Sequence, residues 1–371
     1  MTDIHISPAR GRSVADRVGY AIAGIVTATA GLAAAFLAEA LPPAALESAT
    51  QSLAPADAAL RALIAAAGVA PRSVSVGCVV AVVIATVHLG RRATGDMAAG
   101  AFLALAWILF PPVLAVQALA TPIAPATLLV TVGLAALWPG PSGIRGGLRG
   151  ASRVRDAVGA LALMFAALFG AAGAWASLAG VTLMLLLRLR LWTILAPVIG
   201  VGLAIAAIGS PGSPFAGDAS WVPPDRAAVM FGAVLPFAMI WVGSLLGAVA
   251  SRAAATKYRL GLRVTWVCRA GPPAFAGLLA LAAAGSQAPG PAYLVAGAAF
   301  LPIALIGLLP LVAWVRFAMP KIRSMAAWLA FPVIMYCCFW VVLGPITRDR
   351  FPFGLIPDLA APFAGKEAPA P

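Results

Sequence analysis

Long apolar stretches of the chain alternate with short clusters of polar and basic residues. A helix that crosses a membrane needs ~20 consecutive apolar residues, and many of these stretches have about that length. We therefore expect an all-α fold, a polytopic transmembrane helical bundle of eleven spans. The expected spans lie near residues 18–38, 73–89, 97–119, 123–138, 157–176, 178–190, 193–209, 227–250, 264–285, 292–315 and 325–344.

The fourth and sixth spans, 123–138 and 178–190, are short for a complete crossing. The sixth also includes Arg188 and Arg190, whose charges are unfavourable in lipid. Irregular backbone is tolerated at membrane depth only where protein buries it or it lines a cavity. The sixth span is therefore also compatible with a half-helix or a re-entrant segment.

The composition limits the class of protein. Of 371 residues, 62% are hydrophobic and 10% are charged, whereas typical globular chains are roughly 45–50% apolar and about 25% charged. So few charges cannot cover the surface of a soluble fold of this size. The composition excludes a soluble enzyme, a nucleic-acid-binding domain and a disordered chain, and the many Ala and Gly residues favour close helix packing.

The net charge of +13 has a topological explanation, because Lys and Arg accumulate in the cytoplasmic loops of membrane proteins. With the N-terminus inside, every expected inside loop is basic, and eleven spans place the C-terminus outside. The charge therefore indicates orientation and not a nucleic-acid partner. The basic residues of the inside segments are Arg10, Arg12, Arg17, Arg91, Arg92, Arg145, Arg149, Arg153, Arg155, Arg188, Arg190, Arg252, Lys257, Arg259, Arg263, Arg316, Lys321 and Arg323.

Residues 1–344 form the expected transmembrane domain, with no soluble domain beside it. Its longest outer loop is 39–72, and a second outer loop, 210–226, is rich in Gly and Pro. Residues 345–371 form a Pro-rich outer tail, for which we expect irregular structure.

The outer loop 39–72 contains a short amphipathic pattern. Asp57 and Arg61 form an i,i+4 pair beside its apolar face. We expect a helix that lies on the outer membrane surface, and we interpret Asp57 as a surface residue. The apolar positions at helical spacing are Leu60, Leu63, Ile64 and Ala67.

Cysteine and histidine offer little chemistry. His5 and His88 are the two histidines of the chain, so a His-based metal site or a Ser-His-Asp triad cannot be built. The cysteines have no metal-ligand spacing and are expected to be buried thiols within spans. They are Cys78, Cys268, Cys337 and Cys338.

Three consecutive segments resemble a known family. Residues 70–76 lead into the second span, residues 88–96 end it with Gly-Arg-Arg, and residues 98–104 begin an Ala/Leu-rich helix. This order resembles the GT-C class of membrane glycosyltransferases, which includes protein O-mannosyltransferases and lipid A aminoarabinose transferases. Further similar segments follow in the family's order, at residues 120–124, 185–192, 235–237 and 288–294.

The resemblance implies transfer of a sugar from a polyprenyl-phosphate carrier to an acceptor at the outer face. Such a transfer needs a carboxylate that deprotonates the acceptor or holds a divalent metal ion, and cations that neutralise the leaving phosphate. The family carries an Asp-Glu pair just after the first span. In this chain Glu39 is the nearest carboxylate to that position, and Glu47 is the second.

The chain departs from the family's pattern at three functional positions. No Asp-Glu pair follows the first span, and Ile123 stands where the family has an acid. Between Gln287 and Tyr293 the expected Lys and His are absent. These departures together fit a catalytically degenerate member, a pseudoenzyme, better than a working transferase.

Four further residues are candidates for binding. Arg269 lies within an expected span, and it either holds a lipid phosphate or extends its charge to the inner surface. Asp218, Trp221 and Asp225 share the outer loop 210–226 and would bind sugar, although an interfacial Trp is also common as a membrane anchor.

The leading hypothesis is a bacterial inner-membrane protein with a GT-C-like fold that derives from polyprenyl-phosphate-sugar transferases. Its expected partners are membrane lipid and a polyprenyl-phosphate sugar, with a divalent metal ion if it is active. One alternative is a non-catalytic, lipid-binding or scaffold subunit of a larger membrane complex. A transporter for small solutes or lipid is the other, although paired acids within spans, which many transporters use, are missing from the sequence.

Overall fold

The computed structural model describes residues 14–40, 55–94, 97–109, 122–138, 149–186 and 192–208, with single positions at 114, 117, 118, 302, 303 and 305. In this part of the chain the secondary structure consists of helices joined by turns, and no strand is present, which confirms the all-α class. The helices are α1 Val14–Ala40, α3 Pro55–Ala66, α4 Pro71–Thr94, α5 Met97–Leu109, α7 Ile123–Leu137, α8 Arg149–Ala167, α9 Ala171–Leu186 and α10 Trp192–Ile208.

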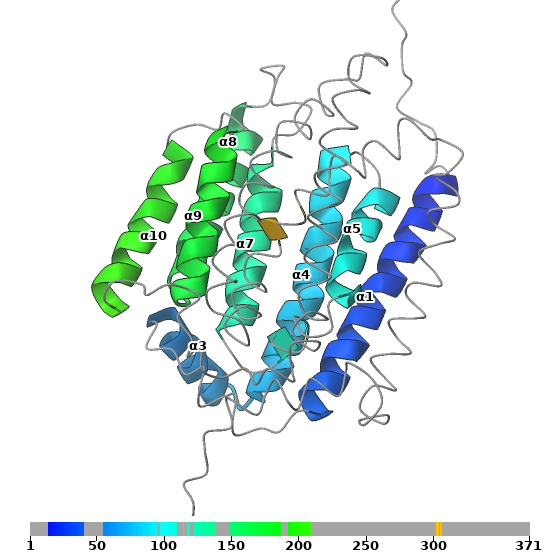
Figure 1. Cartoon of the computed structure of the whole chain (residues 1–371), viewed down its shortest axis with the longest axis horizontal. Helices are drawn as coiled ribbons and strands as arrows, with labels where there is room; N and C mark the ends of the chain where they lie inside the picture. The colour runs from blue at the N-terminus through cyan, green and yellow to red at the C-terminus, as the bar shows by residue number, and fades with distance from the viewer. Residues whose placement is uncertain are drawn as a thin grey trace, which may run out of the picture.

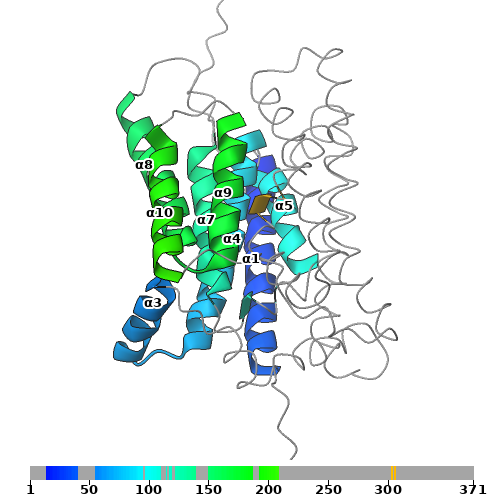
Figure 2. The same ribbon diagram turned by 60° about the vertical axis from the view of Figure 1, so that its left-hand side comes forward.

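The long helices run side by side as a bundle (Figure 1). Helix α1 packs against α4 and α5, and α4 also packs against α7. Helices α7, α8 and α9 contact one another, and α10 packs on α8 and α9. The short helix α3 lies at the lower end of the bundle in both side views (Figures 1 and 2).

Two helices of this bundle are long and apolar enough to cross a membrane, over Arg17–Phe36 and Pro71–Ala93. They correspond to the expected spans 18–38 and 73–89. Shorter apolar helices occupy Ile123–Leu137, Gly173–Leu183 and Ile194–Ala207. The expected spans from residue 227 onward lie outside the described residues, apart from buried positions at 302, 303 and 305.

Contacts between helices show which parts of the chain lie together at each end of the bundle. At the first end, the guanidinium of Arg91 in α4 lies 5.7 Å from the centre of the Tyr20 ring in α1. At the opposite end, the backbone N–H of Ala56 in α3 donates to the carbonyl of Leu168, 3.4 Å away. The beginning of α1 therefore lies beside the last turn of α4, so these two helices run in opposite directions.

The boundary between α8 and α9 differs from the expectation. A span was expected at 157–176, but α8 begins earlier and a turn at residues 168–170 interrupts that range. Gly170 has φ +126°, a left-handed backbone conformation that only glycine adopts easily. The turn is tight, because a Cβ on Gly173 would lie 2.2 Å from the carbonyl oxygen of Ala166.

Large apolar side chains remain exposed on the outer surface of several helices. Leu32 of α1 is 74% exposed, Val154 of α8 is 68% exposed and Leu195 of α10 is 63% exposed. Soluble monomers rarely expose large continuous apolar surfaces. Such exposure is expected where helix faces contact lipid or another protein.

A buried polar pair connects α4 and α5. Thr86 Oγ1 accepts a hydrogen bond from Trp107 Nε1, 2.8 Å away, and donates to the carbonyl of Val82, also 2.8 Å away. Both side chains are fully buried. The indole N–H therefore has its acceptor inside the core, as a buried donor requires.

Replacing Thr86 with valine is expected to lower the free energy of unfolding by roughly 1–3 kcal/mol, because the buried Trp107 N–H would lose its acceptor. Thermal unfolding of the purified protein in detergent measures this change. Thr182→Val is the control, since the Thr182 hydroxyl is exposed and donates only to Leu178 of its own helix. An equal loss in both variants would contradict the proposed role of the indole hydrogen bond.

Candidate functional site at the ends of α1 and α4

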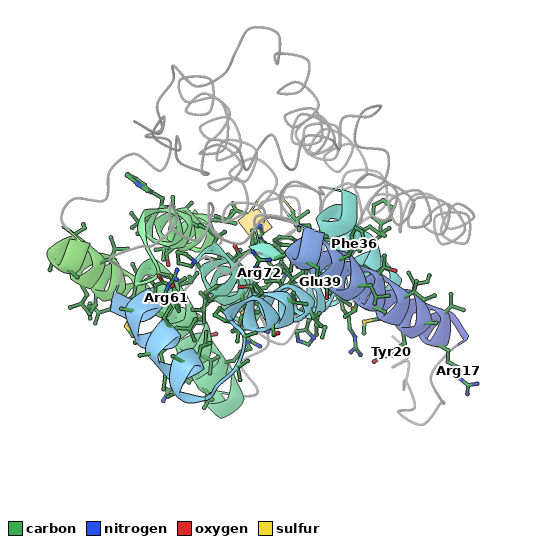
Figure 3. The ribbon with its side chains drawn as sticks, turned by 90° about the horizontal axis from the view of Figure 1, so that it is seen from below. Arg17, Tyr20, Phe36, Glu39, Arg61 and Arg72 are labelled. Atoms are coloured by element: carbon green, nitrogen blue, oxygen red, sulfur yellow. The ribbon has the colours of Figure 1, made fainter. Side chains whose placement is uncertain are left out.

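The candidate acid Glu39 lies in the last turn of α1, and its side chain is exposed. Seen along the bundle from this end, Glu39 lies beside Arg72 of α4 (Figure 3). Arg72 donates a hydrogen bond from Nη1 to the carbonyl oxygen of Ala38. The guanidinium is thereby held at the residue next to Glu39.

The helix ends explain why Arg72 adopts this position. The last carbonyls of a helix lack partners within the helix and carry partial negative charge, so a cation there is favourable. Pro71 begins α4, which suits proline because its missing N–H would be unpaired there. A cation in the first turn of α4 is unfavourable for α4 itself, and the C-terminus of α1 offsets this cost.

Helix α3 lies at the same end and confirms the expected helix in the loop 39–72. Its Arg61 Nε lies 2.9 Å from Asp57 Oδ2, which confirms the predicted i,i+4 pair. The expectation that Asp57 is a surface residue was wrong, because Asp57 is only 3% exposed. It lies in the first turn of α3, next to Ala56, whose N–H donates to Leu168 between α8 and α9.

The apolar face of α3 does not pack fully into the bundle. Leu63 is 68% exposed, and Leu60 and Ile64 are half-buried. Ala67 is exposed as well. An apolar face left open in this way is compatible with the expected position at a membrane surface.

The remaining sequence candidates lie outside the described residues. These are Glu47, Asp218, Trp221, Asp225 and Arg269. The structure therefore places only Glu39 among the predicted site residues, and it adds Arg72.

Within the described helices no three His, Cys, Asp or Glu side chains come together as metal ligands. Glu39 is the one exposed carboxylate that these helices place at this end, since Asp57 is buried against Arg61. A lone carboxylate with a guanidinium beside it does not fit a divalent metal site. Arg72 and Glu39 together do fit a site in which the guanidinium binds an anionic group and the carboxylate lies beside it.

Arg72 was not identified as a functional candidate from the sequence. It was counted only as part of the segment 70–76 that resembles the glycosyltransferase family. The available signal was a basic residue that follows a proline at the start of a span. The expected outer loops are otherwise poor in positive charge. Its contact with Ala38, a residue 34 positions earlier, could not be predicted.

No protein-family model, curated protein or solved structure matches the chain.

Proposed function

We propose that the protein is a multi-pass protein of the bacterial inner membrane that binds a polyprenyl-phosphate-linked sugar at its outer end, with little remaining transfer activity. The observation that supports this most is the hydrogen bond from Arg72 to the Ala38 carbonyl, which holds a cation next to Glu39. The long apolar helices and the apolar side chains on their outer faces support the membrane location.

The two side chains have complementary chemistry. A guanidinium binds a phosphate oxyanion through charge-assisted hydrogen bonds, so Arg72 would hold the phosphate of the carrier. An exposed carboxylate nearby would take the proton from an acceptor hydroxyl, which is the role of Glu39. The proposal of weak transfer rests on the single exposed carboxylate that the described helices supply at this end.

The resemblance to the GT-C class gives this pair its proposed substrate. The segment 70–76, which carries the resemblance, places Arg72 at the start of α4. Glu39 stands closest to the family's acidic pair after the first span. The substrate class therefore rests on the sequence, and the pairing of cation and acid rests on the fold.

Removing the positive charge of this site and removing its negative charge are expected to have opposite effects on the binding of undecaprenyl phosphate. Binding is studied with the full chain in detergent. Arg72→Gln should raise the Kd about tenfold, because a charge-assisted hydrogen bond is lost. Glu39→Gln should lower the Kd about twofold, because it removes a negative charge beside the phosphate. Binding is measured by isothermal titration calorimetry, with melting temperatures recorded for each variant.

Arg17→Gln is the matched control, since Arg17 is exposed at the opposite end of α1 and its loss should leave the Kd unchanged. Arg72→Lys keeps the positive charge. Comparing its Kd and melting temperature with those of Arg72→Gln separates an effect on binding from an effect on folding. If Arg72→Gln binds the lipid as the wild type does, the proposed site is wrong. Co-elution with other membrane subunits at fixed stoichiometry, without lipid binding, would instead support a scaffold subunit.

A further inference from the structure

A second group of charged side chains lies at the opposite end of the bundle from Glu39. Arg92 comes from the last turn of α4, and Arg155 and Asp156 come from α8. Arg92 Nη1 donates to the carbonyl of Ala135 in α7, 3.0 Å away. Arg155 Nη2 lies 3.7 Å from Asp156 Oδ1, and both side chains are close enough to act electrostatically on Arg92.

A close crossing of α7 and α8 brings this group together. A Cβ on Gly159 would lie 2.6 Å from Leu137 Cγ and 3.1 Å from the carbonyl oxygen of Gly133. The absence of side chains at both glycines lets the two backbones approach closely. Gly159 lies one turn after Arg155, and Ala135 lies two residues after Gly133. The crossing therefore places the end of α7, which Arg92 caps, next to Arg155.

Two guanidinium nitrogens in this group lack acceptors. Arg92 Nη2 and Arg155 Nε are buried, and neither has a hydrogen-bond partner in the described part of the chain. A buried charged donor without an acceptor is destabilising, and guanidinium groups carry N–H donors only. The two nitrogens come from different helices, so one acceptor that accepts from both would join α4 to α8.

The charges of the group specify which acceptor fits. Two guanidiniums and the buried carboxylate of Asp156 sum to one positive charge. A monovalent oxyanion neutralises this sum, whereas a dianion would leave excess negative charge against Asp156. The Arg155 side chain is 33% exposed, so the group extends to the surface of the bundle, while the two unpaired nitrogens themselves are buried. Phosphate oxygens are acceptors that match the fork of guanidinium donors.

We propose that Arg92 and Arg155 bind a phosphodiester oxyanion at this end of the bundle. In the expected topology this end faces the cytoplasm, where the headgroup of an anionic phospholipid or a soluble phosphodiester would supply the anion. This site contains neither Glu39 nor Arg72 and is separate from the candidate site at the other end of the bundle. It stands whether or not the protein binds a polyprenyl-phosphate sugar.

The test is a titration of the full chain in neutral detergent with dioctanoyl phosphatidylglycerol. Isothermal titration calorimetry measures the Kd. Arg155→Gln is expected to raise the Kd about tenfold. Arg153→Gln is the matched control, because it removes the same charge from an exposed position two residues away on α8. Its Kd should stay within about twofold of the wild-type value, as expected for an exposed charge.

Arg155→Lys guards against a folding defect, since lysine keeps the charge but cannot reproduce the guanidinium fork. We expect a weaker affinity at an unchanged melting temperature. Equal losses in Arg155→Gln and Arg153→Gln would reduce the effect to general surface charge and overturn the proposal. Wild-type affinity for the lipid in Arg155→Gln or in Arg155→Lys would also overturn the proposal.

Glycerophosphoglycerol, the soluble diester without acyl chains, distinguishes the two sources of the anion. If it displaces the lipid at similar concentrations, the site recognises the phosphodiester itself and a soluble ligand fills it. If it does not compete while phosphatidylglycerol binds in an Arg155-dependent way, the ligand is a lipid headgroup. Both results support the site. Equal, Arg155-independent binding of phosphatidylcholine and phosphatidylglycerol contradicts it.

Discussion

Replacing Gly100 with alanine is expected to destabilise the protein by at least about 2 kcal/mol, although alanine normally favours a helix. Gly100 lies in α5 where this helix crosses α4. A Cβ at this position would lie 2.1 Å from the carbonyl oxygen of Val87 and 3.0 Å from the backbone nitrogen of Arg91. Backbone atoms cannot rotate away as a side chain can, so the two helices would have to separate.

Gly77→Ala provides the matched comparison within α4. A Cβ on Gly77 meets nothing within 4 Å, so this variant is expected to be more stable by about 0.5–1 kcal/mol, the usual gain from replacing a helical glycine. Thermal unfolding in one detergent measures both variants. If Gly100→Ala melts at or above the wild-type temperature, the close α4–α5 crossing is wrong.

Replacing Gly159 with valine is expected to impair two properties together. The free energy of unfolding should fall by roughly 2–3 kcal/mol, because the added side chain overlaps Leu137 and Ala136 of α7. Separation of α7 from α8 would also move the Ala135 carbonyl relative to Arg155. Binding of phosphatidylglycerol should therefore weaken at least as much as in Arg155→Gln, as measured by the same calorimetric titration.

Gly180→Ala controls for the general effect of adding a side chain to a buried glycine. Its Cβ would lie 3.5 Å from Leu134 Cδ2 and 3.6 Å from Leu163 Cδ2, which is ordinary van der Waals contact. Both stability and lipid affinity should remain near the wild-type values. A Gly159→Val variant that is less stable but binds phosphatidylglycerol normally would separate the helix crossing from the anion site and refute their coupling.

The sequence predicts the described helices well where apolar runs end at polar or proline residues. The expected spans 73–89 and 123–138 coincide closely with α4 and α7, because Pro71 and Pro122 lie at their N-terminal boundaries. The boundary between α8 and α9 was missed because Leu168 and Phe169 continue the apolar run through the turn. Gly170 alone marks it, and its positive φ is visible only in the folded chain.

The sites were predicted less completely, because they depend on contacts between distant segments. The position of Glu39 at a helix end follows from local hydropathy. The contact of Arg72 with Ala38 joins residues on either side of the loop 39–72, and the burial of Asp57 arises where α3 meets the α8–α9 turn. Arg92 and Arg155 were expected to be ordinary inside charges. Their buried donors arise from the crossing of α7 and α8 and not from the charge pattern.

The shortness of α7 bears on how the protein is assembled. Its 15 residues extend about 22 Å, less than the ~30 Å of hydrocarbon in a typical bilayer. Most of its side chains are buried, because α4, α8 and α9 surround it. During synthesis, however, α7 leaves the ribosome before α8 and α9 exist. In the membrane location proposed above, α4 would be the described partner available to shelter it until the next helical hairpin is inserted.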